Sequence, residues 1–126
     1  AASDVYKRQK ATLVFDLSKI AGEEEEFMVQ VSTENTIYGA TNQTLYQETV
    51  TSEDAAEGEI TIEMDYIVGC SYRVTVFPNP YTGGDTYPIN DWVGKGDSEA
   101  GFNQLKDGIL TLITPDMTVE LTARNN

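Results

Sequence analysis

Apolar and polar residues alternate with a period of two through much of the chain between Ala11 and Ala123. The last such segment is the clearest, because Met117, Val119 and Leu121 alternate with threonine and glutamate. Successive side chains of a β-strand point to opposite faces, so this pattern places one face against a core and the other in water. The pattern predicts an all-β fold.

The same alternation predicts about seven strands, which favours a single antiparallel β-sandwich of two sheets. Residues 59–64 and 71–76 are expected to be adjacent central strands. Residues 108–114 and 117–123 are expected to form a closing pair, and the acidic stretch 52–58 is expected to be a loop. The other predicted strands are 11–17, 27–32 and, with a less regular pattern, 36–38 and 45–51.

Residues 78–107 interrupt the pattern, because they hold three of the four prolines and five of the ten glycines. This composition predicts one long loop, and such loops are usually functional or contain short elements of their own. Two short elements are compatible with the sequence. One is a helix capped by Ser98 with Phe102 and Leu105 on one face, and the other is an edge strand over residues 87–93.

The first nine residues resemble translated sequencing-adapter read-through rather than native protein. We therefore expect residues 1–9 to be a non-native or disordered tail, with the natural reading frame beginning near Lys10. The alternative is a genuine flexible tail. Residues 10–126 are expected to form one β-sandwich domain, because a chain of 126 residues can bury a core without metal or disulfide staples.

The charge of the chain restricts its partners. There are 21 acidic and 8 basic residues, for a net charge of -13. Phosphate backbones and anionic lipid headgroups would be repelled, so we expect neither nucleic acid nor a membrane surface as a partner. No apolar run reaches the roughly 18 residues of a membrane span, so direct membrane insertion is not expected either. The same charge favours solubility, a cation or a cationic partner, and selects none of them.

The candidate catalytic chemistry is sparse. The chain has no histidine, which removes Ser-His-Asp triads, Cys-His pairs and histidine metal ligands. The single Cys70, between Gly69 and Ser71, is interpreted as a structural thiol. Glu59 and Glu63 are expected to be solvated on the outward face of one strand, rather than to act as the acid and base of a glycosidase. We therefore expect no enzymatic activity.

Four carboxylates of the long loop could supply the hard oxygen ligands that calcium prefers. Their spacing departs from the known calcium-loop pattern, and in a chain this acidic such neighbours also arise by chance. No cofactor other than calcium is expected. The candidate calcium ligands are Asp85, Asp91, Asp97 and Glu99.

Trp92, Tyr81 and Tyr87 are the candidate binding residues, because exposed aromatic rings can stack on sugars or anchor a protein partner. The alternative for Trp92 is that its indole plugs one end of the sandwich core. Asn42-Gln43-Thr44 matches the N-glycosylation sequon, which matters only in a glycosylating host.

Two segments carry a resemblance to a known family. Residues 58–62, followed by Gly69-Cys70-Ser71-Tyr72-Arg73-Val74-Thr75-Val76, are similar to the "G-x-Y-x-V-x-V" core of transthyretin-like domains, which include carboxypeptidase-regulatory-like and collagen-adhesin B-type modules. Residues 109–123 resemble the last two strands of those domains. Residues 72–80 resemble the tyrosine strand and Asn-Pro loop of fimbrillin-type pilins. The resemblance implies a transthyretin-like or Ig-like sandwich with a structural or adhesive role at the cell surface.

The resulting expectation is a non-enzymatic, extracellular β-sandwich that is a subunit of a surface filament or pilus, or a module of a surface protein. Its partners would be copies of itself or other surface subunits, joined through strand edges. The rival hypothesis is a carbohydrate-binding accessory module that binds glycans through Trp92, Tyr81 and Tyr87.

Overall fold

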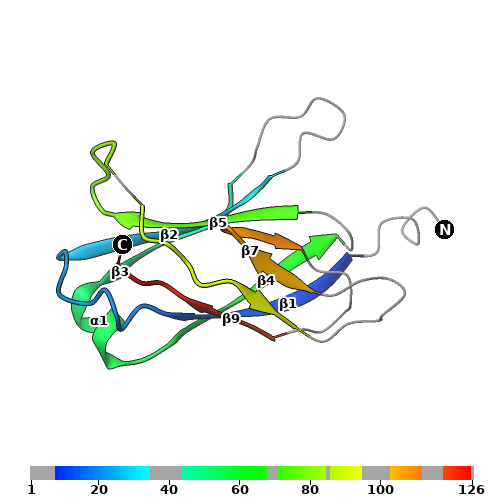
Figure 1. The fold of residues 1–126 in the computed structure, drawn as a ribbon, viewed down its shortest axis with the longest axis horizontal. Coiled ribbons are helices and arrows are strands. Elements are labelled where there is room, and N and C mark those ends of the chain that lie inside the picture. Colours follow the sequence, from blue (N-terminus) through cyan, green and yellow to red (C-terminus); the bar gives the residue numbers. More distant parts are fainter. Residues whose placement is uncertain are drawn as a thin grey trace.

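The computed structural model describes residues 8–34, 44–67, 71–84, 86–94, 103–111 and 118–125. These residues lie in two packed sheets, which confirms the all-β, two-sheet architecture that the alternation predicts (Figure 1). The elements are β1 (Arg8–Asp16), β2 (Glu26–Thr33), β3 (Thr44–Thr51), α1 (Ser52–Glu57), β4 (Ile60–Ile67), β5 (Ser71–Pro78), β6 (Trp92–Val93), β7 (Gln104–Lys106), β8 (Ile109–Thr111) and β9 (Thr118–Thr122).

The two sheets differ in size. The smaller sheet has the strand order β4-β1-β9, and the larger has the order β3-β2-β5-β8-β7-β6. β1 begins at Arg8, so two residues of the segment assigned by sequence to the tail pair with β4. The predicted strand 36–38 and the thiol of Cys70 fall outside the described residues.

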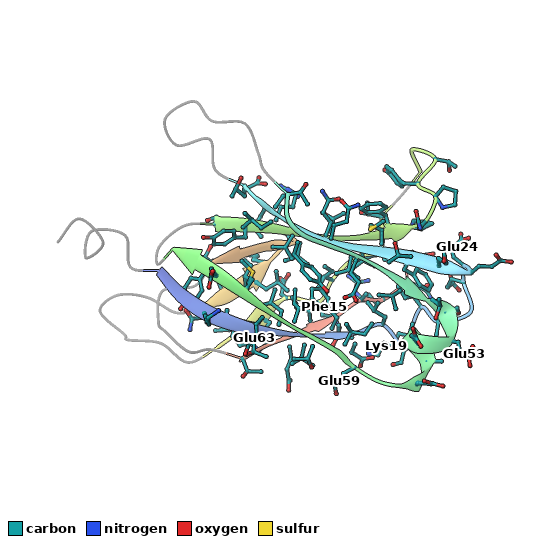
Figure 2. The ribbon with its side chains drawn as sticks, turned by 180° about the vertical axis from the view of Figure 1, so that it is seen from behind. Phe15, Lys19, Glu24, Glu53, Glu59 and Glu63 are labelled. Atoms are coloured by element: carbon teal, nitrogen blue, oxygen red, sulfur yellow. The ribbon has the colours of Figure 1, made fainter. Side chains whose placement is uncertain are left out.

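The core lies between the sheets and is built by the period-two alternation. In β1, Ala11, Leu13 and Phe15 are at most 1% exposed. Phe15 lies between the two sheets, whereas Glu59 and Glu63 point outward, as the alternation predicts (Figure 2). The inward positions of other strands are filled in the same way by Phe27, Val29 and Val31 of β2, Tyr72, Val74 and Val76 of β5, and Val119 and Leu121 of β9.

The sheets are not purely antiparallel. β9 pairs in parallel with β1, with Leu13 opposite Val119 and Phe15 opposite Leu121. The prediction that 108–114 and 117–123 form a closing pair is therefore wrong, because β8 belongs to the larger sheet and β9 to the smaller. The period-two pattern indicates which face of a strand is buried. Because strands of both sheets bury an apolar face, the pattern does not indicate to which sheet a strand belongs.

The prediction that 59–64 and 71–76 are adjacent central strands is also wrong. β4 pairs with β1 at the edge of the smaller sheet, whereas β5 lies between β2 and β8 in the larger sheet. The two strands therefore belong to different sheets and share no backbone hydrogen-bond ladder. Their burial patterns are compatible with either arrangement, since both strands alternate regularly.

The segment 78–107 is not one long loop. It contains β6 and β7, which raises the number of described strands to nine. Leu105 is a buried residue of β7 rather than part of a helix; Ser98 and Phe102 fall outside the described residues. The edge strand expected over 87–93 is present only as β6 and two isolated bridges, Val76 with Tyr87 and Ile89 with Ala123.

The expected loop 52–58 is also different, because Ser52–Glu57 form the helix α1. Thr51 caps the helix by accepting a hydrogen bond from the Asp54 N–H at 3.1 Å, and Glu53 and Asp54 stand in the first turn, where carboxylates favour a helix. Ala55 is fully buried and anchors the helix to the core. α1 joins the edge strand of one sheet to the edge strand of the other.

Candidate functional site

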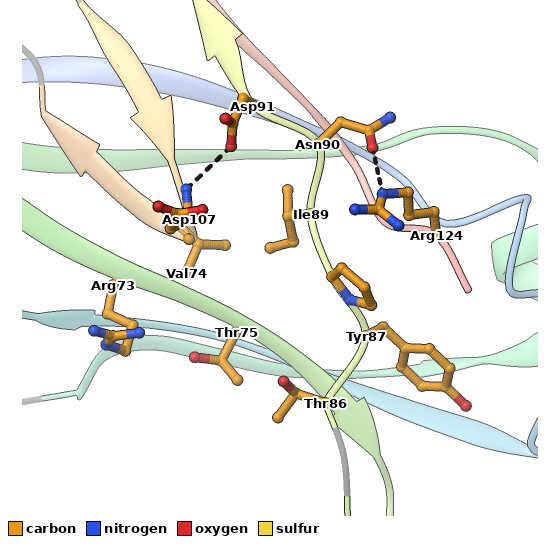
Figure 3. Close-up of a pocket in the computed structure, with 12 residues that line it drawn as sticks. Arg73, Val74, Thr75, Thr86, Tyr87, Ile89, Asn90, Asp91, Asp107 and Arg124 are labelled. Carbon is orange, nitrogen blue, oxygen red and sulfur yellow. Dashed lines mark hydrogen bonds between the residues drawn. The ribbon is translucent and has the colours of Figure 1, made fainter. Parts of the chain in front are cut away.

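A groove opens where the larger sheet loses its regular pairing beside β5. β8 pairs with only the first three residues of β5, 71–73. Segment 86–91 lies alongside the later part of β5 and is joined to it by the bridge between Val76 and Tyr87. The groove between them has a volume of about 770 Å³ (Figure 3). This volume is within the range of about 300–1,000 Å³ that is typical of small-ligand pockets.

Three hydrogen bonds close the rim of this groove into a ring. Each bond joins two of three segments, which are β5, the turn at 107–108 and segment 86–91, so the segments fix one another's positions. The bonds run from Val74 N–H to Gly108 O (2.8 Å), from Tyr87 N–H to Val76 O (2.8 Å) and from Asp107 N–H to Asp91 Oδ1 (3.1 Å).

The turn in this rim follows from its sequence. Asp107 and Gly108 both have positive φ angles, of 52° and 80°. A two-residue hairpin turn needs positive φ at both central positions, and Asp-Gly is among the pairs that adopt it most readily. The turn connects β7 to β8 and brings the Gly108 carbonyl to β5.

Segment 86–91 passes from the larger sheet to the smaller and closes one side of the sandwich. Its start bonds β5, and its later part bonds the end of the chain, because Asn90 N–H donates to Thr122 O and Arg124 N–H donates to Pro88 O, both at 2.9 Å. Between these bonds Ile89 is 9% exposed and belongs to the core. The groove therefore has an apolar floor, formed by Ile89 and Val74.

Two guanidinium groups lie at opposite ends of the groove. Arg73 donates through Nε and Nη2 to both carboxylate oxygens of Glu34, at 2.7 and 2.8 Å. These hydrogen bonds lower the pKa of Glu34 and raise the pKa of Arg73. At the other end Arg124 Nε donates to Asn90 Oδ1 at 2.8 Å. Both arginines are thus held by neighbouring side chains.

The three aromatic candidates occupy different surroundings. Tyr81 is 47% exposed, and its ring packs on Phe77 with a centroid distance of 4.9 Å. Tyr87 lines the groove and contacts Phe27 edge to face at 5.6 Å; burial, followed by the charges of two nearby glutamates, raises the pKa of Tyr87. Trp92 is half-buried and packs against the core.

The calcium candidates are only partly described. Asp85, Asp97 and Glu99 fall outside the described residues. Asp91 is at the rim of the groove, where its carboxylate accepts the Asp107 N–H. Within the ranges that the structure describes, no group of three or more acidic or cysteine side chains is arranged to hold a metal ion.

On the side of the sandwich away from the groove, β3 is the edge strand of the larger sheet and β4 is the edge strand of the smaller sheet. A second hollow of about 310 Å³ lies on this side, between the end of β3, α1 and the start of β4. On β3, Tyr46 donates a hydrogen bond to Glu48, and burial together with that carboxylate raises the pKa of the tyrosine. The carboxylates that line the hollow are Glu48, Asp54, Glu57 and Glu59.

No protein-family model, curated protein or solved structure matches this chain. In the described part of the chain, no helix has the length and apolar character needed to cross a membrane.

Sequence reasoning missed most of the groove. It named Tyr87 and Asp91 but omitted Thr75, Asn90, Asp107 and Arg124. One signal was available, because Asp107-Gly108 lies between the apolar residues Leu105 and Leu110 and so predicts a hairpin turn. The other groove residues are distant from one another in sequence. They come together only because segment 86–91 crosses between the sheets.

Proposed function

We propose that this chain is a non-enzymatic structural or adhesive β-sandwich of the cell surface, of transthyretin-like or Ig-like type, that assembles through the open edge of β3. It acts outside the cell as a subunit of a filament or pilus, or as a module of a larger surface protein. Its partners are further copies of the chain or other surface subunits. The observation that carries this proposal is the exposed, nearly uncharged edge of β3.

The backbone of β3 offers a row of hydrogen-bonding groups. β3 ends the larger sheet and pairs with β2. Ser52 N–H donates to Glu25 O at 2.9 Å, which sets the phase of the antiparallel ladder. Glu48 therefore directs its backbone groups to β2, whereas Gln47 and Thr49 direct theirs to the open edge. Such a row readily pairs with a strand of another chain.

The side chains of β3 favour this pairing. From Thr44 to Thr51 the only charged residue is Glu48. Threonine, tyrosine and valine, which favour strands, fill five of the other positions. Leu45 is 45% exposed. In natural proteins, charged side chains usually protect an edge strand from pairing with another chain. β3 has little of this protection.

The edge of β4 is different. Glu63 and Asp65 are exposed on its outward face, and Glu59 immediately precedes the strand. Pairing two copies of this edge would bring carboxylates close to one another, which is unfavourable. β4 is thus protected against self-association, and β3 is the edge that we assign to assembly.

The proposal is tested with Gln47→Pro, which removes an N–H that faces the open edge. Proline is tolerated in an edge strand when its missing N–H points away from the sheet. We expect this variant to keep the circular dichroism spectrum of the parent chain but to lose concentration-dependent association in analytical ultracentrifugation. Glu48→Pro is the matched control, because it removes a bond to β2 and should destabilise the fold.

Electron microscopy of the parent chain at high concentration provides the second measurement. We expect oligomers or fibres that are absent from Gln47→Pro samples. If the parent chain sediments as a monomer at every concentration and forms no fibres, self-assembly through β3 is excluded. Association that persists unchanged in Gln47→Pro would assign assembly to another surface.

A further inference from the structure

We propose that the groove between β5 and segment 86–91 binds a neutral saccharide. This inference is independent of assembly through β3, because the groove lies beside β5 and segment 86–91, whereas β3 ends the sheet on the other side of β2. It also differs from a site built from the three aromatic candidates, since Tyr81 and Trp92 do not line the groove.

The groove is preformed. Its rim is tied by the three hydrogen bonds that join β5, the turn at 107–108 and segment 86–91, and its ends are fixed by the Glu34–Arg73 and Asn90–Arg124 contacts. A ligand that enters a preformed site loses little affinity to ordering of the protein. This rigidity distinguishes the groove from a gap between mobile surface loops.

The polar groups of the rim match hydroxyl groups. Each ligand hydroxyl can donate one hydrogen bond and accept others, so it can use carboxylate acceptors, guanidinium donors and neutral hydroxyl partners together. Asp107 offers a carboxylate, and Thr75 and Thr86 offer hydroxyls at the rim (Figure 3). Asn90 has an amide, whose oxygen already accepts from Arg124.

The charges of the lining select against ions. The lining holds two arginines, Arg73 and Arg124, and two aspartates, Asp91 and Asp107, and Arg73 is already paired with Glu34. A small anion or cation therefore meets groups of both signs, and the net charge of -13 on the chain disfavours anions further. A neutral ligand with many hydroxyls can bond to both kinds of group.

A small part of the groove lining is apolar, because Val74 and Ile89 are only 3% and 9% exposed. Val74 and Ile89 belong to the core, and Pro88 lies beside them in the lining. A pyranose ring has apolar C–H faces surrounded by hydroxyls, which is the same arrangement as an apolar floor with a polar rim. Small-ligand sites in general combine apolar walls with a few convergent polar groups.

The test is a titration of the full chain with a panel of methyl glycosides of glucose, galactose, mannose and N-acetylglucosamine, followed by amide NMR. We expect at least one glycoside to give saturable shifts at residues 73–75, 86–91 and 107–108. Thr75→Val and Asp107→Gly should each weaken that binding at least tenfold. Glycine keeps the positive φ of position 107, so the turn is retained.

Thr61→Val is the matched control, because Thr61 is an exposed threonine on the outward face of β4. It should bind the glycoside as the parent does, and the urea midpoints of all variants should show that they remain folded. If no glycoside shifts the groove amides, or if the shifts map instead to Tyr81 or Trp92, the inference is wrong. Shifts in the groove that appear only with an added peptide would also overturn it, since the ligand class would then be different.

Discussion

At the scale of single residues, the two-residue turn at Asp107 and Gly108 holds several segments of the molecule together. It joins β7 to β8, donates the Asp107 N–H to Asp91 and offers the Gly108 carbonyl to Val74. All of these contacts depend on two consecutive positive φ angles. Glycine adopts such angles without steric cost, whereas residues with a β-carbon do so at a cost of about 1–2 kcal/mol.

Replacing Gly108 by alanine should therefore destabilise the fold. The added β-carbon would stand 3.4 Å from the Val74 carbonyl oxygen at a φ of 80°. We expect the free energy of unfolding to fall by about 1–2 kcal/mol in urea denaturation. Gly58→Ala is the control, because Gly58 has extended backbone and open space around it, and it should change stability little. Equal losses in both variants would contradict the argument.

The Glu34–Arg73 ion pair gives a residue-scale prediction about pH. The pKa of Glu34 is lowered from 4.5 in the folded state, so the pair stabilises the fold above that pH and loses its effect as the pH falls below it. Both side chains are partly exposed, at 30% for glutamate and 46% for arginine, which limits the contribution to about 1 kcal/mol or less.

Glu34→Gln should consequently lower stability at neutral pH by up to about 1 kcal/mol and have a smaller effect in acid. Urea midpoints measured above and below pH 4.5 check this. Glu63→Gln, on the outward face of β4, is the charge-matched control. A Glu34→Gln effect that stays constant across the titration would show that the loss does not come from the ion pair.

At the scale of elements, α1 shows how a short helix depends on its ends. Six residues are too few for an isolated helix to be stable in water. The Thr51 cap, the acidic first turn and the buried Ala55 compensate for the short length. Gly22 N–H also donates to Ser52 Oγ at 2.5 Å, which ties the helix to the connection between β1 and β2. Tertiary contacts thus decide that 52–57 is helical rather than a loop.

Thr51→Ala should weaken α1, because it removes the acceptor of the Asp54 N–H. We expect a loss of about 1 kcal/mol in the free energy of unfolding. Thr51→Ser retains the hydroxyl and should restore most of that loss. Hydrogen exchange of the Asp54 amide gives a local measurement, which should be faster in Thr51→Ala than in Thr51→Ser. Indistinguishable exchange in the two variants would contradict a capping role.

At the scale of the whole molecule, the charge of -13 is the dominant property. The acidic side chains that are labelled in Figure 2 point outward from β4, from α1 and from the connections next to β2 and β4. Self-repulsion of this kind destabilises a compact chain, and salt screens it. The charge therefore makes stability dependent on ionic strength even though the core is apolar.

We expect the Tm to rise by about 2–4 °C when ionic strength increases from about 0.01 M to about 0.15 M, which shortens the Debye length from about 30 Å to about 8 Å. Differential scanning calorimetry with sodium chloride checks the direction. Calcium chloride and magnesium chloride at matched ionic strength separate screening from binding. A rise with calcium alone would support a specific site at the loop carboxylates. A Tm that falls with sodium chloride would refute the screening argument.

The sequence by itself determined the all-β class, the inward-facing residues of β1, β2, β5 and β9, and the outward position of Glu59 and Glu63. The reason is that the period-two alternation indicates which face of each strand is buried. At the end of segment 78–107, the apolar residues Leu105 and Leu110 on either side of Asp107-Gly108 also predict a hairpin.

The tertiary structure alone decided which strands share a sheet, that β9 runs parallel to β1, and that segment 86–91 crosses between the sheets to form the groove. The physical reason is that side-chain pattern selects a face, whereas sheet partners are joined by backbone N–H and C=O groups that are nearly the same for every residue. Partners are chosen by how all the buried faces pack together at once. β4 and β5 illustrate this, because equally regular alternation places one at an edge and the other at the centre of a different sheet.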